Sequence, residues 1–178
     1  MKFSRRIVPV AAVAAMAVSS SAFAVDGTIN FEGLITDVTC DISVNGATNN
    51  ATVTMPSASI AALTSAGSTA GVTPFNINLK GCAGATLQTA RTHFEMGPSV
   101  DAINGHLNNV TGTAGNVQVQ LLNSLLAPIP VGQVNQGDTA IDISSGAGTM
   151  SYFARYYATG PATAGTVGTR VDYTIQYD

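Results

Sequence analysis

The side chains that most often carry catalysis are few in this chain and form no known catalytic pattern. Its 178 residues include two cysteines, two histidines and ten acidic residues. The sequence has no Gly-x-Ser-x-Gly elbow, no His-Glu-x-x-His zinc motif and no Gly-Lys-Ser/Thr phosphate loop. His93 precedes Phe94 in an alternating segment, which favours a surface or half-buried strand position over a general base. The sequence therefore predicts a protein that is not an enzyme and that uses no metal or cofactor.

The first 24 residues have the features of a secretory signal peptide. A basic start with Lys2, Arg5 and Arg6 precedes an Ala/Val-rich run over residues 7–18, and small residues around Ala24 offer a cleavage position. Because the apolar run is too short to span a bilayer, we expect export without direct membrane insertion. The predicted signal peptide is therefore residues 1–24.

Cys40 and Cys82 are the two cysteines of the exported chain. In an oxidising compartment two such cysteines most simply pair with each other. The alternative, a reactive thiol or a metal ligand, has no support, because neither His93 nor His106 lies at metal-ligand spacing from a cysteine. We therefore predict a Cys40–Cys82 disulfide that closes a loop of about 40 residues.

Charges in the exported chain are sparse and mainly negative. After loss of the leader, four basic and ten acidic residues remain, which gives a net charge of −6. Lys80, Arg91, Arg155 and Arg170 are scattered singly, so there is no basic stripe to bind nucleic acid or anionic lipid. Charged residues make up 10% of the chain, against about 25% in typical soluble domains. Such a surface favours contact with other proteins, or reflects adaptation to life outside the cell.

Alternation of apolar and polar residues dominates the exported sequence, and clusters rich in Gly, Asn and Ser interrupt it at short intervals. This pattern is typical of an all-β sandwich, and no linker divides the chain into further domains. Strands are expected over residues 28–41, 51–55, 73–79, 92–95, 116–122, 149–157 and 169–177.

The segments between these strands are polar or rich in glycine. Pro56 and Ser57 supply the start signal for one short helical turn over residues 57–63. Asn50-Ala51-Thr52 and Asn109-Val110-Thr111 match the N-glycosylation pattern, but the leader looks bacterial and so short a pattern often arises by chance. Loops, with room for short edge strands, are expected over residues 45–50, 65–71, 104–115 and 132–148.

The amino-terminal end of the exported chain has one apolar side. Val25, Gly27, Ile29 and Phe31 alternate with polar residues, so an extended segment would present these four on one side. Alternation alone favours a simpler interpretation, in which this segment is the first strand of the chain's own sandwich. A second interpretation, that this segment serves another molecule, depends on the opposite end of the chain.

The carboxyl-terminal run keeps an apolar side up to the penultimate residue, through Val171, Tyr173, Ile175 and Tyr177. An immunoglobulin-like sandwich normally has a seventh strand that covers the edge left by the sixth. If the terminal run is the sixth strand, no sequence remains to supply the seventh, and the open edge would invite aggregation unless another chain filled it. Residues 25–31 of a neighbouring molecule have the alternation and the terminal position to fill that edge.

Several motifs extend over the whole exported chain. A glycine in the fourteenth position from the carboxyl end, Gly165, accompanies the penultimate Tyr177. The others are Gly27-Thr28-Ile29-Asn30-Phe31-Glu32-Gly33 leading to Val38-Thr39-Cys40, Pro74-Phe75-Asn76-Ile77-Asn78-Leu79-Lys80-Gly81-Cys82, Ala154-Arg155-Tyr156-Tyr157-Ala158-Thr159-Gly160 and Tyr173-Thr174-Ile175-Gln176-Tyr177-Asp178. Taken together, they resemble the pilins of chaperone/usher fimbriae, close in pattern to the major subunits of type 1 fimbriae.

The resemblance implies an incomplete immunoglobulin-like (pilin) sandwich that lacks its last strand and is completed by donor-strand complementation. It implies an amino-terminal donor-strand extension over residues 25–33 and a pilin domain over residues 34–178. The side chains inserted into the next subunit would be those of Val25, Gly27, Ile29 and Phe31. The groove that a chaperone strand and then a donor strand occupy would be formed by Gly165, Val171, Tyr173, Ile175 and Tyr177.

The function implied is that of a structural subunit, exported through the periplasm to the cell surface and polymerised by donor-strand exchange into a fimbria that supports bacterial adhesion. The implied partners are a periplasmic pilus chaperone, an outer-membrane usher and other pilin subunits in a head-to-tail polymer. The alternative is a minor adaptor or tip-associated pilin of the same fibre class, since an adaptor shares the single-domain plan. A two-domain tip adhesin needs more residues than remain after the leader.

Overall fold

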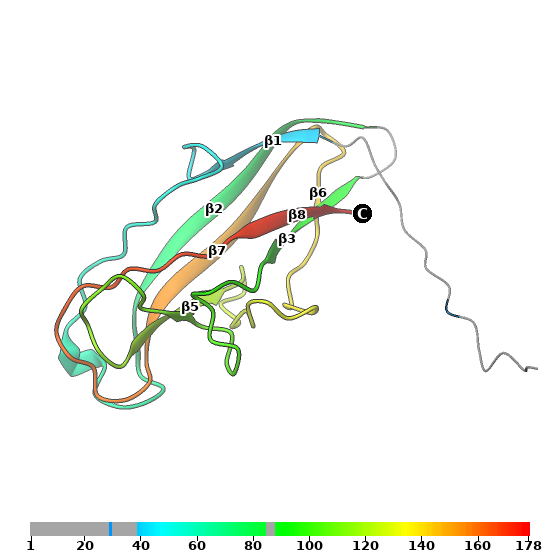
Figure 1. Cartoon of the computed structure of the whole chain (residues 1–178). Coiled ribbons are helices and arrows are strands. Elements are labelled where there is room, and N and C mark those ends of the chain that lie inside the picture. Colours follow the sequence, from blue (N-terminus) through cyan, green and yellow to red (C-terminus); the bar gives the residue numbers. More distant parts are fainter. Residues whose placement is uncertain (1–28, 30–38, 85–87) are drawn as a thin grey trace, which may run out of the picture. The chain divides into compact units, whose positions relative to one another are not determined.

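The computed structural model describes residues 29, 39–84 and 88–178, and the fold is given for these residues (Figure 1). The predicted signal peptide, residues 1–24, lies outside them. Most of the predicted extension, residues 25–33, also lies outside them, and only Ile29 of that segment is described. The predicted boundary between the extension and the domain that starts at residue 34 therefore stays a prediction.

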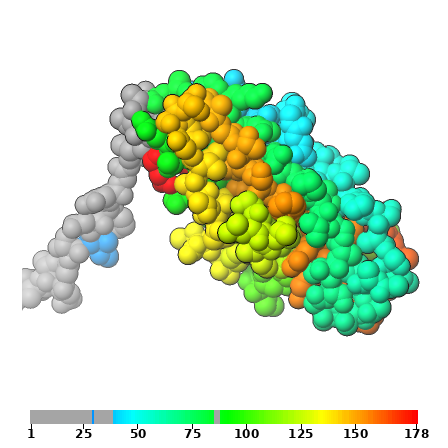
Figure 2. All heavy atoms as spheres, turned by 180° about the vertical axis from the view of Figure 1, so that it is seen from behind, coloured from blue at the N-terminus to red at the C-terminus, as the bar shows by residue number. Residues whose placement is uncertain are grey.

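The described body is all-β, as the alternation predicts, and its strands form two antiparallel sheets. The five-stranded sheet has the order β1 (Thr39–Val44), β2 (Thr69–Ala83), β7 (Ala147–Ala158), β5 (Val117–Leu122) and β4 (Leu107–Asn108). The three-stranded sheet has the order β6 (Ile141–Asp142), β3 (Thr89–Phe94) and β8 (Tyr173–Tyr177). Figure 2 shows the side where the orange band of β7 lies beside β2, the pairing with the longest register.

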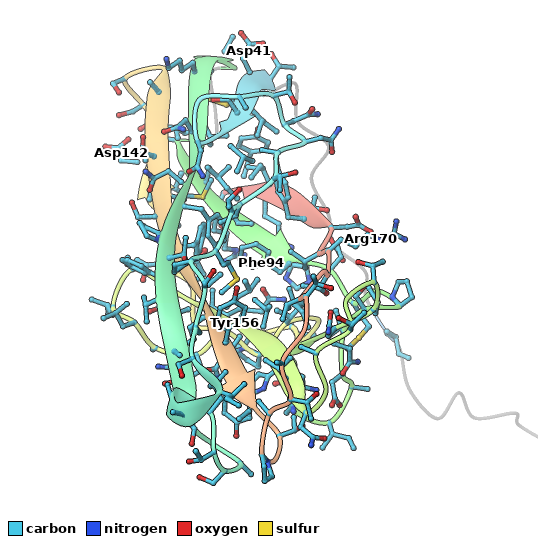
Figure 3. All side chains as sticks on the ribbon, turned by 90° about the vertical axis from the view of Figure 1, so that its left-hand side faces the viewer. Asp41, Phe94, Asp142, Tyr156 and Arg170 are labelled. Carbon is cyan, nitrogen blue, oxygen red and sulfur yellow. A yellow bond between two sulfur atoms is a disulfide. The ribbon has the colours of Figure 1, made fainter. Side chains whose placement is uncertain are left out.

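The core lies between the two sheets, because the strands turn alternate apolar residues inward. Tyr152 of β7 packs edge-on against Phe94 of β3, with ring centroids 5.2 Å apart, and lies 5.5 Å from the ring of Phe75 in β2. Figure 3 shows Phe94 deep among the side chains, whereas Arg170 lies at the periphery. Each large apolar side chain buried here stabilises the fold by roughly 1.5 to 3 kcal/mol.

Most predicted strands are present, but the strand predicted over residues 51–55 is wrong. After β1, the chain turns at Asn45 and Gly46, which both have positive φ angles, and no strand is assigned between Val44 and Ile60. Val53 and Met55 are nevertheless half-buried against the core, as their alternation predicts. The segment lacks a ladder partner among the described residues, and side-chain packing without a partner does not make a strand.

The predicted helical turn over residues 57–63 is present as a single 3-10 turn, Ile60–Ala62. The Ser59 hydroxyl caps it by accepting a hydrogen bond from the amide of Ala61 at 3.2 Å. Leu63 is buried beside Val117, whereas Ile60 is exposed, so the two do not share one buried face as the pattern predicts. The short strands β4 and β6 lie within the predicted loops 104–115 and 132–148.

The predicted disulfide is confirmed. Cys40 in β1 and Cys82 in β2 are bonded, with their Cα atoms 4.1 Å apart. The two strands pair next to the bond, where Thr39 lies opposite Ala83 and Asp41 opposite Lys80. The disulfide therefore fixes the edge strand β1 to the long strand β2 at one end of the five-stranded sheet.

His106 belongs to a polar cluster that the sequence does not reveal. All six residues of β5 are buried, so Gln118 and Gln120, which point away from the core, need polar partners under the covering loop. The Nδ1 of His106 lies 3.2 Å from Oε1 of Gln118, and its Nε2 lies 2.7 Å from Nε2 of Gln120. A neutral ring that donates from Nδ1 and accepts at Nε2 satisfies both contacts. Burial lowers the pKa of His106.

We predict that removal of both cysteines lowers the free energy of unfolding by about 4 kcal/mol, the chain-entropy value for a loop of this length. The bond spans 42 residues of sequence, so its loss frees a large loop in the unfolded chain. Urea unfolding of a Cys40→Ala, Cys82→Ala variant measures the effect. A midpoint equal to that of the parent protein would contradict it.

We also predict that the protein loses stability as the pH falls from about 7.5 to 5.5, in part because of His106. Its lowered pKa means that the unfolded chain takes up the proton more readily, so acid favours unfolding. Asp101 and Arg155 are the charged neighbours, and their effects on this pKa oppose each other. The variant His106→Gln should show a shallower decline of the urea midpoint over this pH range. An unchanged slope would exclude His106 as the source.

Candidate functional site

The last strand, β8, leaves one of its edges unpaired within the part of the chain that the structure describes. It pairs with β3 from Ala90 opposite Tyr177 to Phe94 opposite Tyr173. Among the described residues no strand pairs with its other side. The main-chain amides and carbonyls on that side are therefore available to an added strand.

The apolar side chains of this end form what we call the terminal strip: Val171, Tyr173, Ile175 and Tyr177. All four are half-buried and pack against the main core, whereas the intervening polar residues are exposed. Burial raises the pKa values of Tyr173 and Tyr177, so both phenols stay neutral at physiological pH. The strip thus combines an open main-chain edge with partly covered apolar side chains.

The segment that follows β1, which pairs with no strand among the described residues, is hydrogen-bonded to the strip. The hydroxyl of Tyr173 donates a hydrogen bond of 2.9 Å to the carbonyl of Asn49. Beyond Asn49, Val53 and Met55 pack half-buried against the same core that the strip covers. Figure 1 shows that the cyan chain that follows β1 and the orange-red chain that precedes β8 both extend to the same end of the body.

An open pocket of about 440 Å³ lies where these two segments meet. Met55 and Val167 line it and, like the terminal strip, pack against the main core. Its lining contains no charged residue, and its volume is within the range that accepts a bulky apolar group. The lining residues are Met55, Ser57, Ala58, Ile60, Leu63, Ala114, Val117, Tyr156 and residues 162–167.

The structure brings together the predicted groove residues that it describes. Val171, Tyr173, Ile175 and Tyr177 form the terminal strip, and Gly165 lies in the wall of the pocket. Their assignment as a groove for a donated strand remains a prediction. The predicted donor residues Val25, Gly27 and Phe31 lie outside the described residues, and Ile29, the fourth, is exposed.

Sequence reasoning missed the pocket itself. Its lining comes from five parts of the chain, and only folding brings Tyr156 of β7 next to the turn around Ile60. Figure 3 shows Tyr156 between the strands, well away from the surface position of Asp142. No signal in the sequence marks it: the pattern predicts that Ile60 shares a face with Leu63, and only the structure shows that Ile60 is exposed.

Fold and site together define a β-sandwich domain whose last strand has an apolar side and, among the described residues, an unpaired edge that can accept another strand. The chain belongs to the type-1 fimbrial protein family (FimA), whose model, described as type-1 fimbrial protein, A, matches residues 55–178.

Known relatives cover nearly the whole sequence. The F17 fimbrial protein of Escherichia coli is 40% identical over 172 residues, with 93% of this chain and 94% of the relative covered. The major fimbrial subunit SMF-1 of Stenotrophomonas maltophilia is 40% identical over 166 residues, covering 89% and 96%. The minor fimbrial subunit HifD of Haemophilus influenzae is 36% identical over 184 residues, covering 94% and 81%.

A solved structure supports the fold. The P pilus rod subunit PapA matches with a TM-score of 0.60 at 18% identity, over 78% of this chain and 99% of that chain. The predicted immunoglobulin-like sandwich of the pilin type is therefore confirmed. The chain is a structural subunit of a surface fimbria, and its relatives are fimbrial proteins rather than enzymes. No helix in the described ranges is long and apolar enough to cross a membrane.

Proposed function

We propose that this chain is the major subunit of its fimbria, that it polymerises by donor-strand exchange, and that the fibre supports bacterial adhesion. The observation that carries the proposal is the unpaired edge of β8 with its half-buried terminal strip. A sandwich that stops at this edge needs a strand from elsewhere, because exposed apolar surface beside open main-chain groups is an aggregation hazard.

Residues 25–31 of another copy are the donor in this proposal, and residues 25–33 form the extension that carries it. Val25, Gly27, Ile29 and Phe31 would lie over the terminal strip while their main chain pairs with β8. Burial of several apolar groups, at roughly 1.5 to 3 kcal/mol each, would make release very slow. Because each subunit gives one strand and receives another, the contact is head-to-tail and builds an open filament.

The same edge needs protection before assembly. A periplasmic chaperone would cover the terminal strip with a strand of its own, and an outer-membrane usher would be the place where the donor replaces it. The exposed open edge supports this order of events, since a free subunit would otherwise meet other exposed edges. No nucleic acid is expected among the partners, since the exported chain is acidic and its four basic residues are scattered.

The major role is supported by the likeness to the major subunit SMF-1, and the alternative is supported by the likeness to the minor subunit HifD. A minor adaptor or tip-associated pilin would use the same edge and the same donor segment. Electron microscopy of cells that lack this chain separates the two roles. Loss of whole fibres marks a major subunit, whereas loss of tips alone marks a minor one.

We predict that deletion of residues 25–31 leaves a subunit that its chaperone captures but that cannot insert into a neighbour. A matched pair of substitutions sharpens the test: Ile29→Asp should block assembly because it places a charge on the inserted side, and Asn30→Asp should not. Fibres per cell, counted by electron microscopy, give the measurement. Fibres of normal length from the deletion variant would rule out this donor.

A second prediction concerns the receiving edge. Ile175 is half-buried in β8, whereas its neighbour Thr174 is exposed. Ile175→Ala removes apolar surface from the strip and should therefore weaken strand capture. We expect the amount of subunit incorporated into fibres to fall by about tenfold, the factor that corresponds to the transfer free energy lost. Thr174→Ala serves as the control and should leave incorporation near the parent level. Equal effects of the two substitutions would count against the terminal strip as the binding surface.

A further inference from the structure

Residues 162–167 form the outer wall of the pocket, and the core supports only the two ends of this wall. Its ends, Ala162 and Val167, pack against buried residues, but the four residues between them are exposed. No strand is assigned between Ala158 and Tyr173. The middle of the wall therefore owes its position to something other than the hydrophobic core or a sheet.

A second loop, residues 109–116, hydrogen-bonds along the length of this wall. The amide of Ala114 donates to the carbonyl of Thr166 at 2.9 Å, and the amide of Thr163 donates to the carbonyl of Gly115 at 3.1 Å. The hydroxyl of Thr163 accepts from the amide of Gly115 at 2.8 Å. These bonds satisfy main-chain groups that would otherwise be left to water, so the second loop acts as a brace for the wall.

Two glycines permit this close approach. A Cβ atom on Gly165 would overlap the main-chain nitrogen of Ala114, and one on Gly112 would overlap the carbonyl oxygen of Thr166. Gly165, which the family resemblance places in the groove, is thus required here because a larger residue would push the wall away from its brace.

Several side chains join the two loops, among them Thr113, Thr163 and Thr166, and Asn109 makes the most bonds. Its Nδ2 donates to the carbonyls of Ala114 at 2.9 Å and Thr166 at 3.1 Å. Its Oδ1 accepts from the amides of Gly112 at 3.0 Å and Gly168 at 2.8 Å. All four hydrogen-bonding positions of the carboxamide are used. The nitrogen that the Asn-x-Thr pattern would offer to a glycan is therefore engaged inside the fold.

We propose that Asn109 is a positioning residue for the pocket: its carboxamide holds the exposed wall in the open form that accepts one end of the donor segment. The proposal rests on the proposed function, since it takes residues 25–31 of another copy as the occupant. Without Asn109, the wall has to be ordered again each time a donor binds, and this cost weakens binding. Asn109 itself touches no donor residue in this scheme and acts through the wall.

The test uses the full mature chain, refolded with a fluorescent peptide of residues 25–33. Release of the peptide is followed after addition of excess unlabelled peptide. Asn109→Ala should release it about tenfold faster than the parent, the loss expected for the hydrogen bond to Thr166 in the wall and the one to Gly168 just beyond it. The matched control is Asn135→Ala, because Asn135 makes one local bond, accepting from the amide of Gly137 at 3.0 Å, in a loop remote in sequence from the pocket lining.

Two further readouts separate positioning from general stability. The urea midpoints measure the loss of global stability in each variant, and hydrogen exchange at the amide of Ala114, which bonds the wall, should become faster in Asn109→Ala but not in Asn135→Ala. Asn109→Asp keeps the accepting oxygen but places a carboxylate oxygen opposite the carbonyls of Ala114 and Thr166, so its release should also be faster than that of the parent.

Release from Asn109→Ala as slow as from Asn135→Ala would overturn the role of Asn109 and leave donor-strand exchange standing. A parent chain that binds no peptide would overturn both. If Asn109→Ala does not fold, Asn109→Asp decides: release faster than from the parent supports the positioning role, and a rate equal to that of the parent contradicts it.

Discussion

The structure depends on one constraint: within the described residues, the last strand has a main-chain partner on one side only and an apolar face that is covered only in part. β8 is fixed by β3 through a continuous register, and the terminal carbonyl of Asp178 accepts hydrogen bonds from the amides of Gln88 and Thr89. The strand is therefore held firmly to the last residue while its outer edge stays open. A well-ordered strand with an open edge is a template for pairing, whereas a frayed one is not.

The rest of the body keeps that edge in place. The disulfide anchors β1 to β2, the aromatic contacts of Tyr152 join the two sheets, and the polar cluster around His106 closes the outer face of β5. Beyond the edge, the two segments that flank the pocket join no strand ladder among the described residues. The segment around Met55 is held by side-chain packing, and residues 162–167 are held by hydrogen bonds to the loop 109–116.

The sequence predicted those parts of the fold that local pattern controls. Period-two alternation identified most strands, two cysteines in an exported chain identified the disulfide, and the apolar run up to Tyr177 identified the edge strand. It failed over residues 51–55, because alternation reports which side chains face the core but not whether a neighbouring strand exists to pair with. It also failed inside the polar loops. Gln136 lies in a segment predicted as a loop, yet it is buried and bonds both main-chain groups of Phe94.

The pocket and its brace could not be predicted, because contacts between distant segments create them and no residue type marks them. The family resemblance marked Gly165 and a glycosylation pattern marked Asn109, but neither signal shows the close approach of the two loops in which these residues take part. The central claim, that a strand of one copy completes the sandwich of the next, is tested most directly by a cryo-electron microscopy structure of the purified fibre. The expected density places residues 25–31 of one subunit along the open edge of β8 in its neighbour. Density that pairs these residues within their own subunit, with the neighbour's edge empty, would contradict it.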